Sequence, residues 1–89
     1  MAAFDCEIVS TTKSLFSAKA EMVVVPGVEG SMGFLAGHAP LVSVLADGEV
    51  RLTPEGSSNI QRFNLKGGYV QVSDTKVIIL ADSCEPVAA

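Results

Sequence analysis

The sequence has few of the side chains on which metal binding and thiol chemistry depend. Its 89 residues include one histidine, two cysteines and no tryptophan. Cys6 and Cys84 lie near opposite ends of the chain and His38 stands alone between them, so no metal-ligand spacing is present. We therefore expect no metal and no other cofactor. A disulfide between the two cysteines stays open, although we interpret both as small buried hydrophobic residues.

Positive charge and long hydrophobic runs are also scarce. Ten acidic residues against six basic ones give a formal net charge of -4 and an isoelectric point near 4.7. This charge repels a phosphate backbone and argues against nucleic-acid binding. No hydrophobic run approaches the roughly 20 residues of a membrane-spanning helix, and residues 1–7 have no basic segment followed by a hydrophobic one. We expect a soluble chain without direct membrane insertion or a targeting peptide.

The length of the chain permits one small hydrophobic core. Hydrophobic residues make up 48% of the sequence and charged residues 18%. A chain of this size buries only about 60–65% of its unfolded surface, so good packing or a partner has to support its stability. We predict a single domain over residues 1–84, followed by a frayed end over residues 85–89.

An alternation of hydrophobic and polar residues dominates the pattern. Phe4, Cys6 and Ile8 alternate with acidic residues, as in a strand with one buried face. In the run 18–25, three consecutive valines favour a strand, and Met22 and Val24 are assigned to its buried side. Further strands are predicted at 41–45, 49–53, 60–65, 69–72 and 76–81, separated by turn residues.

This spacing predicts an all-β, two-sheet β-sandwich of about ten short strands. No segment has convincing helical periodicity. The expected core between the two sheets comprises Phe4, Cys6, Ile8, Met22, Val24, Val70, Val72, Ile79 and Leu80. The pair Gly67-Gly68 is interpreted as a bend where two backbones come close.

Glycines 27, 30 and 33 recur every third residue within the segment 27–41. This spacing matches neither G-x-G-x-x-G nor the P-loop, and no helix follows, so nucleotide binding is disfavoured. We interpret these glycines as residues that permit positive φ in tight turns between strands.

Two chemical alternatives remain open from the sequence. His38 could act as the base of a small hydrolase, with a serine nucleophile and Asp47, Asp74 or Asp82 as the orienting carboxylate, but no nucleophile-elbow signature is present. Lys76, after a turn, resembles the carrier lysine of biotinyl or lipoyl domains, although the flanking methionines of biotinyl domains are missing. A stand-alone β-sandwich binding or carrier module remains the main alternative function.

Four motifs occur in order along the chain. They are Gly30-x-Met32-Gly33-Phe34-x-x-Gly37-His38-Ala39-Pro40-Leu41, Gly48-x-Val50-Arg51, Gly67-Gly68-Tyr69-x-x-Val72 and Val77-x-Ile79-Leu80-Ala81-Asp82. Together they resemble the successive signatures of the ε subunit of F-type ATP synthases. The Gly-His-Ala-Pro-Leu block is the sharpest of them, and the resemblance extends over nearly the whole chain.

This resemblance implies a β-sandwich whose one end meets the membrane-embedded c-ring and whose side packs on the γ shaft. Carried over by position, the residues toward the c-ring are Val28, Glu29, Gly30 and Ser31, and those toward γ are Ser10, His38, Ala39, Pro40, Leu41, Val42 and Ser43. Such a rotor subunit would couple ion translocation to ATP synthesis without catalysing a reaction. It would belong to a proton-translocating complex, peripheral on the cytoplasmic face of the bacterial plasma membrane.

Three features depart from the resembled pattern. Ala36 stands where the family often has proline before the Gly-His pair, which would leave that turn less rigid. Ser31 stands where the family often has an acidic residue, which removes a charged contact from that position. Family members usually continue into a C-terminal helical hairpin, which would begin here at residues 85–89.

Overall fold

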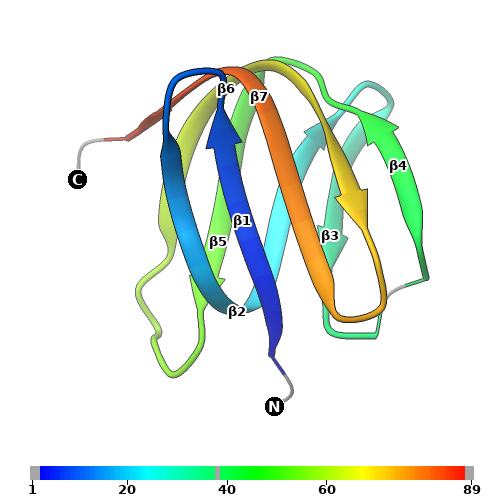
Figure 1. Cartoon of the computed structure of the whole chain (residues 1–89), viewed down its shortest axis with the longest axis vertical. Helices are drawn as coiled ribbons and strands as arrows, with labels where there is room; N and C mark the ends of the chain where they lie inside the picture. Colours follow the sequence, from blue (N-terminus) through cyan, green and yellow to red (C-terminus); the bar gives the residue numbers. More distant parts are fainter. Residues whose placement is uncertain (1–2, 38, 88–89) are drawn as a thin grey trace.

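The computed structural model describes residues 3–37 and 39–87, and the regular structure in these ranges is all β. The all-β prediction is therefore confirmed. The strands, drawn in Figure 1, are β1 (Phe4–Ser10), β2 (Ser14–Gly27), β3 (Gly30–Phe34), β4 (Leu41–Val44), β5 (Gly48–Pro54), β6 (Gln61–Val72) and β7 (Lys76–Pro86).

Three long strands bend and so take part in both layers of a sandwich. β2 pairs with β1 through residues 14–20 and with β5 through residues 20–24. β6 pairs with β5 through residues 61–65 and with β4 through residues 69–72, while β7 accompanies β6 along both parts. We call the layer ordered β4-β6-β7-β1-β2 sheet I and the layer ordered β3-β2-β5-β6-β7 sheet II (Figure 1).

The two-sheet prediction is confirmed, but the expected number of about ten strands is wrong. The described residues form seven strands, because β2, β6 and β7 each supply one segment to each sheet. In addition, β1 pairs with β2, so the order β1-β7-β6-β5-β2 closes on itself and leaves β3 and β4 outside the circuit.

The bend in β2 occurs at a β-bulge between Ala20 and Met22. The extra residue there, Glu21, shifts the alternation by one position, so that Val23 and Val25 point into the core after Ala20. The assignment of Met22 and Val24 to the core is therefore wrong. Met22 is exposed, and Val24 is half-buried on the outer face of sheet II.

The shifted alternation in β2, which buries Val23 instead of Val24, can be tested by substituting each valine. Val23→Ala removes two buried methyl groups from a fully buried site, so we expect a loss of about 2 kcal/mol in the free energy of unfolding. Val24→Ala, on the outer face, should cost less than about 1 kcal/mol. Urea denaturation of both variants measures the difference. Equal losses would contradict the placement of the bulge.

The bend in β6 occurs at Gly67 and Gly68, which have φ values of 65° and 120°. A Cβ atom at Gly68 would overlap the carbonyl oxygen of Leu80 on β7. The predicted close approach of two backbones is confirmed, but β6 continues through it as one strand rather than ending there. Only a residue without a side chain fits this crossing of the two strands.

The core lies between the two sheets and is entirely hydrophobic. Phe4, Cys6, Ile8, Val70, Val72 and Ile79 are buried as predicted. Leu80 is only half-buried, because it follows Ile79 in β7 and successive side chains point to opposite faces of a sheet.

The structure contains one strand that was not predicted, β3, and one that is longer than predicted, β7. β3 forms from a glycine-containing segment that was expected to be turns, since it pairs with residues 23–27 of β2. Among its glycines and Gly27, positive φ occurs at Gly30 alone. Strand pairing also continues to Pro86 opposite Phe63, two residues past the domain boundary expected at residue 84.

Candidate docking surface

Of the residues that the resemblance places toward γ, those from Ala39 to Ser43 lie in or just before β4, at one edge of sheet I. Val42 is 68% exposed, whereas Leu41 packs partly against the core. Ala39 and Pro40 are exposed in the segment before β4, and Ser10 ends β1. His38 lies outside the described residues, so its role stays a prediction.

The outer face of sheet I carries a hydrophobic row across four strands. Val44 on β4 pairs with Tyr69 on β6, and Tyr69 pairs with Leu80 on β7. Leu80 in turn pairs with Val9 on β1. Paired residues share one face of a sheet, and the core lies on the opposite face, so these four side chains point outward together.

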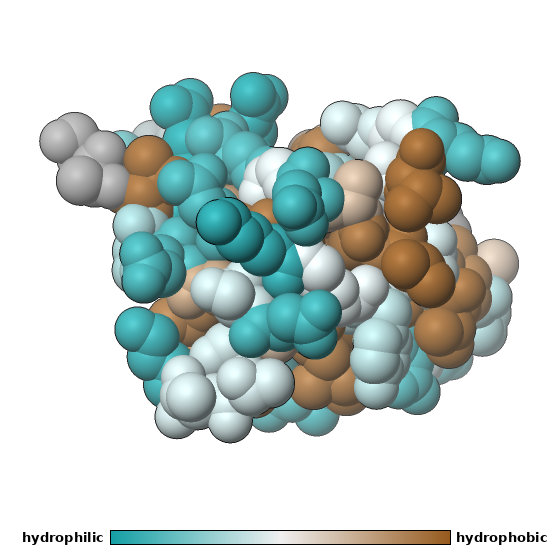
Figure 2. Space-filling model, turned by 90° about the horizontal axis from the view of Figure 1, so that it is seen from above, coloured by the Kyte–Doolittle hydropathy of each residue, from teal (hydrophilic) through white to brown (hydrophobic). Residues whose placement is uncertain are grey.

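The neighbouring row adds two more hydrophobic side chains. Val42 pairs with Gln71, which pairs with Ile78. We call the outward side chains of Val9, Val42, Val44, Tyr69, Ile78 and Leu80 the apolar face. Figure 2 shows hydrophobic surface gathered on the side of the molecule where β4 lies. A contiguous hydrophobic patch on a small protein indicates an interaction site.

A hollow of about 220 Å³ opens beside the apolar face. The backbone of Gly68 forms part of its wall, next to Tyr69, Val9 and Leu80. The hollow could receive a side chain of a partner that packs on this face.

The residues that the resemblance places toward the c-ring form the turn between β2 and β3. Val28 is 66% exposed at this turn, and Glu29, Gly30 and Ser31 are exposed as well. Gly27 and Gly30 pair across the turn, which makes it a two-residue connection. The turn thus presents one hydrophobic and one acidic side chain at an end of the sandwich.

The two predicted sets lie side by side. A hollow of about 220 Å³ is lined by residues 27–32 together with Ser43 of β4. Gly27 forms a bridge with Leu45, which follows β4 directly. The structure therefore brings the turn between β2 and β3 next to the edge of the apolar face.

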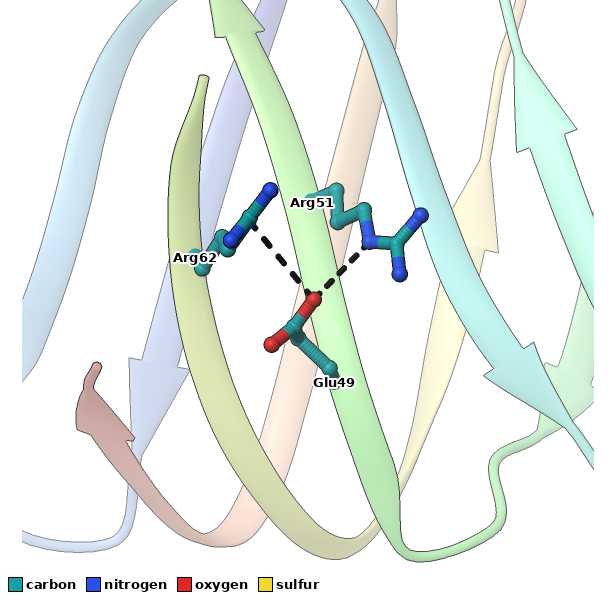
Figure 3. A network of polar contacts seen from close by, with 3 residues as sticks. All are labelled: Glu49, Arg51 and Arg62. Atoms are coloured by element: carbon teal, nitrogen blue, oxygen red, sulfur yellow. Dashed lines mark hydrogen bonds and ion pairs between the residues drawn. The ribbon is translucent and has the colours of Figure 1, made fainter. Parts of the chain in front are cut away.

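Ion pairs border the apolar face on sheet I, where Glu7 is the strand partner of Ile78, and also lie on sheet II. Lys19 pairs with Asp5 at 3.0 Å and Lys76 with Glu7 at 3.4 Å, both at the β1 side of sheet I. On β5 and β6 of sheet II, Glu49 Oε1 lies 2.8 Å from Arg51 Nε and 3.8 Å from Arg62 Nε (Figure 3). Exposed pairs of this kind contribute little stability, so they mark surface suited to water rather than to burial.

The geometry offers little for the chemical alternatives. The Cys6 and Cys84 thiols are free and buried, as predicted. Burial, reinforced by the Glu7 carboxylate, raises the pKa of Cys6 to about 12, so this thiol stays protonated and is a poor nucleophile. Lys76, the lysine of the carrier alternative, forms an ion pair in which its Nζ lies 3.4 Å from a Glu7 carboxylate oxygen. Asp47, one of the possible orienting carboxylates of the hydrolase alternative, accepts a hydrogen bond from the backbone N–H of Gly67.

Residues 3–37 and 39–87 contain neither a candidate metal site nor a candidate membrane-spanning helix. Within these ranges, no group of three or more histidine, cysteine, aspartate or glutamate side chains could hold a metal ion. The same ranges contain no helix with the length and hydrophobicity needed to cross a bilayer.

Sequence reasoning missed five residues of the apolar face: Val9, Val44, Tyr69, Ile78 and Leu80, the last of which was assigned to the core. A signal was present at two of them, because Tyr69 and Ile78 alternate with the core residues Val70 and Ile79 and so had to point outward. Their grouping with β4 depends on strand register, which the local pattern does not contain.

Comparison with known proteins gives concordant matches. Residues 3–87 match the family described as "ATP synthase, Delta/Epsilon chain, beta-sandwich domain". The chain is 42% identical over 83 residues to the ATP synthase epsilon chain of Chromohalobacter salexigens, covering 93% of this chain and 58% of that protein. It is 43% identical over 88 residues to the epsilon chain of Rhodopseudomonas palustris, covering 99% of this chain and 64% of that protein.

A solved structure agrees with this fold. A chain in the cryo-EM structure of Euglena gracilis mitochondrial ATP synthase, OSCP/F1/c-ring, superposes with a TM-score of 0.88 at 27% identity. The match covers 97% of this chain and 54% of that one. The present chain thus spans roughly three-fifths of the length of the curated relatives, 58% and 64% for the two named above.

Proposed function

Because the chain belongs to the family of ATP synthase delta/epsilon β-sandwich domains, we propose that it is a central-stalk (rotor) subunit of an F-type ATP synthase that joins the γ shaft to the c-ring. The observation that carries this proposal is the apolar face on sheet I, with the β2–β3 turn beside it. The epsilon-chain relatives support the same assignment.

In this proposal the apolar face docks γ. Val42 and Val44 are 68% and 64% exposed in the chain alone, so they lose the most water when a partner covers them. Burial of hydrophobic surface contributes about 25 cal/mol per Å², and a stable interface covers about 800 Å² on each partner. Of the predicted γ set, Val42 belongs to this face, and Ala39, Pro40 and Ser43 lie beside it in or just before β4.

The β2–β3 turn docks the c-ring. Ser31 lacks the charge that the resembled pattern often has at its position, so Glu29 carries the negative charge of the turn. Such a charge favours a basic or polar partner loop. The subunit would sit peripherally on the membrane-bound complex, on the cytoplasmic face of a bacterial plasma membrane, and would serve proton-driven ATP synthesis.

The task is mechanical, and we assign no catalytic residue. Coupling rotation of a ring to a shaft needs two interfaces held by a rigid body, which a closed two-sheet sandwich provides. We place the sandwich domain at residues 1–84, and strand pairing continues beyond it to Pro86. Residues 85–89 are the segment where the helical hairpin of the resembled family would begin. No observation in residues 3–37 and 39–87 specifically favours the hydrolase or the carrier alternative.

Isothermal titration of the 89-residue chain with the γ subunit tests the proposal. We expect a one-to-one complex with a dissociation constant of about 1 µM or tighter, as is usual for an interface of standard size. Intact mass of the chain, purified from cells that make biotinyl and lipoyl ligases, should show no addition at Lys76. Absence of γ binding, or a modified Lys76, would contradict the rotor assignment.

A further inference from the structure

Asp47 lies at the point where the two proposed interfaces meet. It stands in the turn between β4 and β5, and its Oδ1 accepts a hydrogen bond of 2.9 Å from the backbone N–H of Gly67. Gly67 belongs to the bend of β6 and directly precedes Gly68 and Tyr69 beside the apolar face. The carboxylate thus ties the β4–β5 turn to the strand that carries part of that face.

The other side of the same turn is bonded to the base of the β2–β3 turn. The N–H of Ala46 donates to the carbonyl oxygen of Pro26 at 2.8 Å, and Leu45 bridges Gly27. A Cβ atom at Gly48 would come within 2.9 Å of the Pro26 ring, so the two segments are in close contact. The β4–β5 turn is therefore held to the proposed c-ring turn by its backbone.

The two connections form one continuous path. It runs from the turn with Val28 and Glu29 through Pro26 and Ala46 to Asp47, and from there to the bend of β6. Most of this path consists of backbone bonds. A backbone bond runs beside it, because the N–H of Leu45 donates to the carbonyl oxygen of Gly68 at 2.9 Å. The Asp47 carboxylate is the side-chain link, so a single substitution removes this link and loosens the connection without altering either interface.

We propose that Asp47 is a positioning residue, which fixes the c-ring turn relative to the apolar face so that both partners can bind at once. This inference rests on the proposed function. Simultaneous binding to two sites gains affinity only when their geometry matches the spacing of the partners. Loss of the carboxylate should therefore weaken binding to the assembled partners more than binding to either partner alone.

The test compares Asp47→Ala with Asp47→Asn, since asparagine keeps a side-chain oxygen that can accept the Gly67 N–H but removes the charge. Asp74→Ala, in the exposed turn between β6 and β7, controls for the loss of one negative charge. Three quantities are measured: the exchange rate of the Gly67 amide by NMR, the affinity for isolated γ, and the affinity for an assembled γ–c-ring complex.

For Asp47→Ala we expect exchange of the Gly67 amide to become about tenfold faster, as the loss of one hydrogen bond implies. Affinity for γ alone should stay within about twofold, and affinity for the assembled complex should fall about tenfold. Asp47→Asn and Asp74→Ala should both behave like the unaltered chain.

Three results would overturn the proposal. If Asp47→Ala binds the assembled complex normally, the Asp47 carboxylate does not position the turn. If Asp47→Asn is as weak as Asp47→Ala, the charge acts directly on a partner instead. If the unaltered chain binds neither γ nor the assembled complex, the proposed function is itself wrong and this inference with it, a result distinct from a defect confined to the variant.

Discussion

Replacement of Gly68 by alanine is expected to abolish stable folding of the chain. The added Cβ would overlap the Leu80 carbonyl oxygen and lie 2.8 Å from the Ala81 Cα atom, both of which belong to the backbone of β7. No side-chain rotation can relieve such a contact, so β6 and β7 would have to separate. A chain of this size has only about 4–13 kcal/mol of stability, and we expect a loss above about 4 kcal/mol.

Gly56→Ala is the matched control. Gly56 also has a positive φ, 73°, but no heavy atom lies within 4 Å of the position its Cβ would take. It should therefore show the backbone cost alone, about 1 kcal/mol. Urea denaturation followed by circular dichroism measures both variants. Similar unfolding midpoints for the two would show that the crossing of β6 and β7 does not depend on Gly68.

Crossed aspartate substitutions should separate the two proposed partners. Val42→Asp puts a charge into the apolar face, and burying it without a counterion should weaken γ binding by about 100-fold. Val28→Asp removes the exposed hydrophobic side chain of the β2–β3 turn, so the lost hydrophobic contact should weaken capture by the c-ring while γ binding stays within about threefold. Both side chains are about two-thirds exposed, 68% and 66%, so folding should change by less than about 0.5 kcal/mol.

Each variant is the control for the other, because both exchange an exposed valine for aspartate. Binding to γ and to the c-ring is measured separately by titration, and thermal melting confirms that both variants are folded. If both variants lose both partners, the two interfaces are not distinct. If Val42→Asp binds γ normally, γ docks elsewhere on the molecule.

Local alternation was sufficient to predict the strands with regular faces. Phe4, Cys6 and Ile8 are buried as their spacing indicates, and β7 follows the same rule around Ile79. It failed at β2, because the bulge at Glu21 is a property of pairing with β5 and leaves no mark in the hydrophobic pattern. β3 was missed for a similar reason, since its glycines have no strand propensity and β2 holds them in place.

The site was predictable in part. From the two sets that the resemblance gave, the fold brings Ser43 next to the turn that holds Val28 and Glu29, because one hollow is lined by residues 27–32 and Ser43. The outward row from Val44 to Val9 was not predictable, because it joins residues of four strands through their register. The sequence suggests Asp47 only as a partner for His38, whereas its observed partner, Gly67, is twenty positions away in the sequence.

The pairing of β1 with both β7 and β2 gives the sandwich the cross-section of a tube rather than of a split sleeve. A split sleeve twists easily because its two lips slide past each other along the seam. A closed tube of the same wall has no seam, and twisting it requires every hydrogen-bonded ladder around its circumference to shear together. A torque applied at one end of this molecule would therefore reach the other end with little of it lost as internal twist.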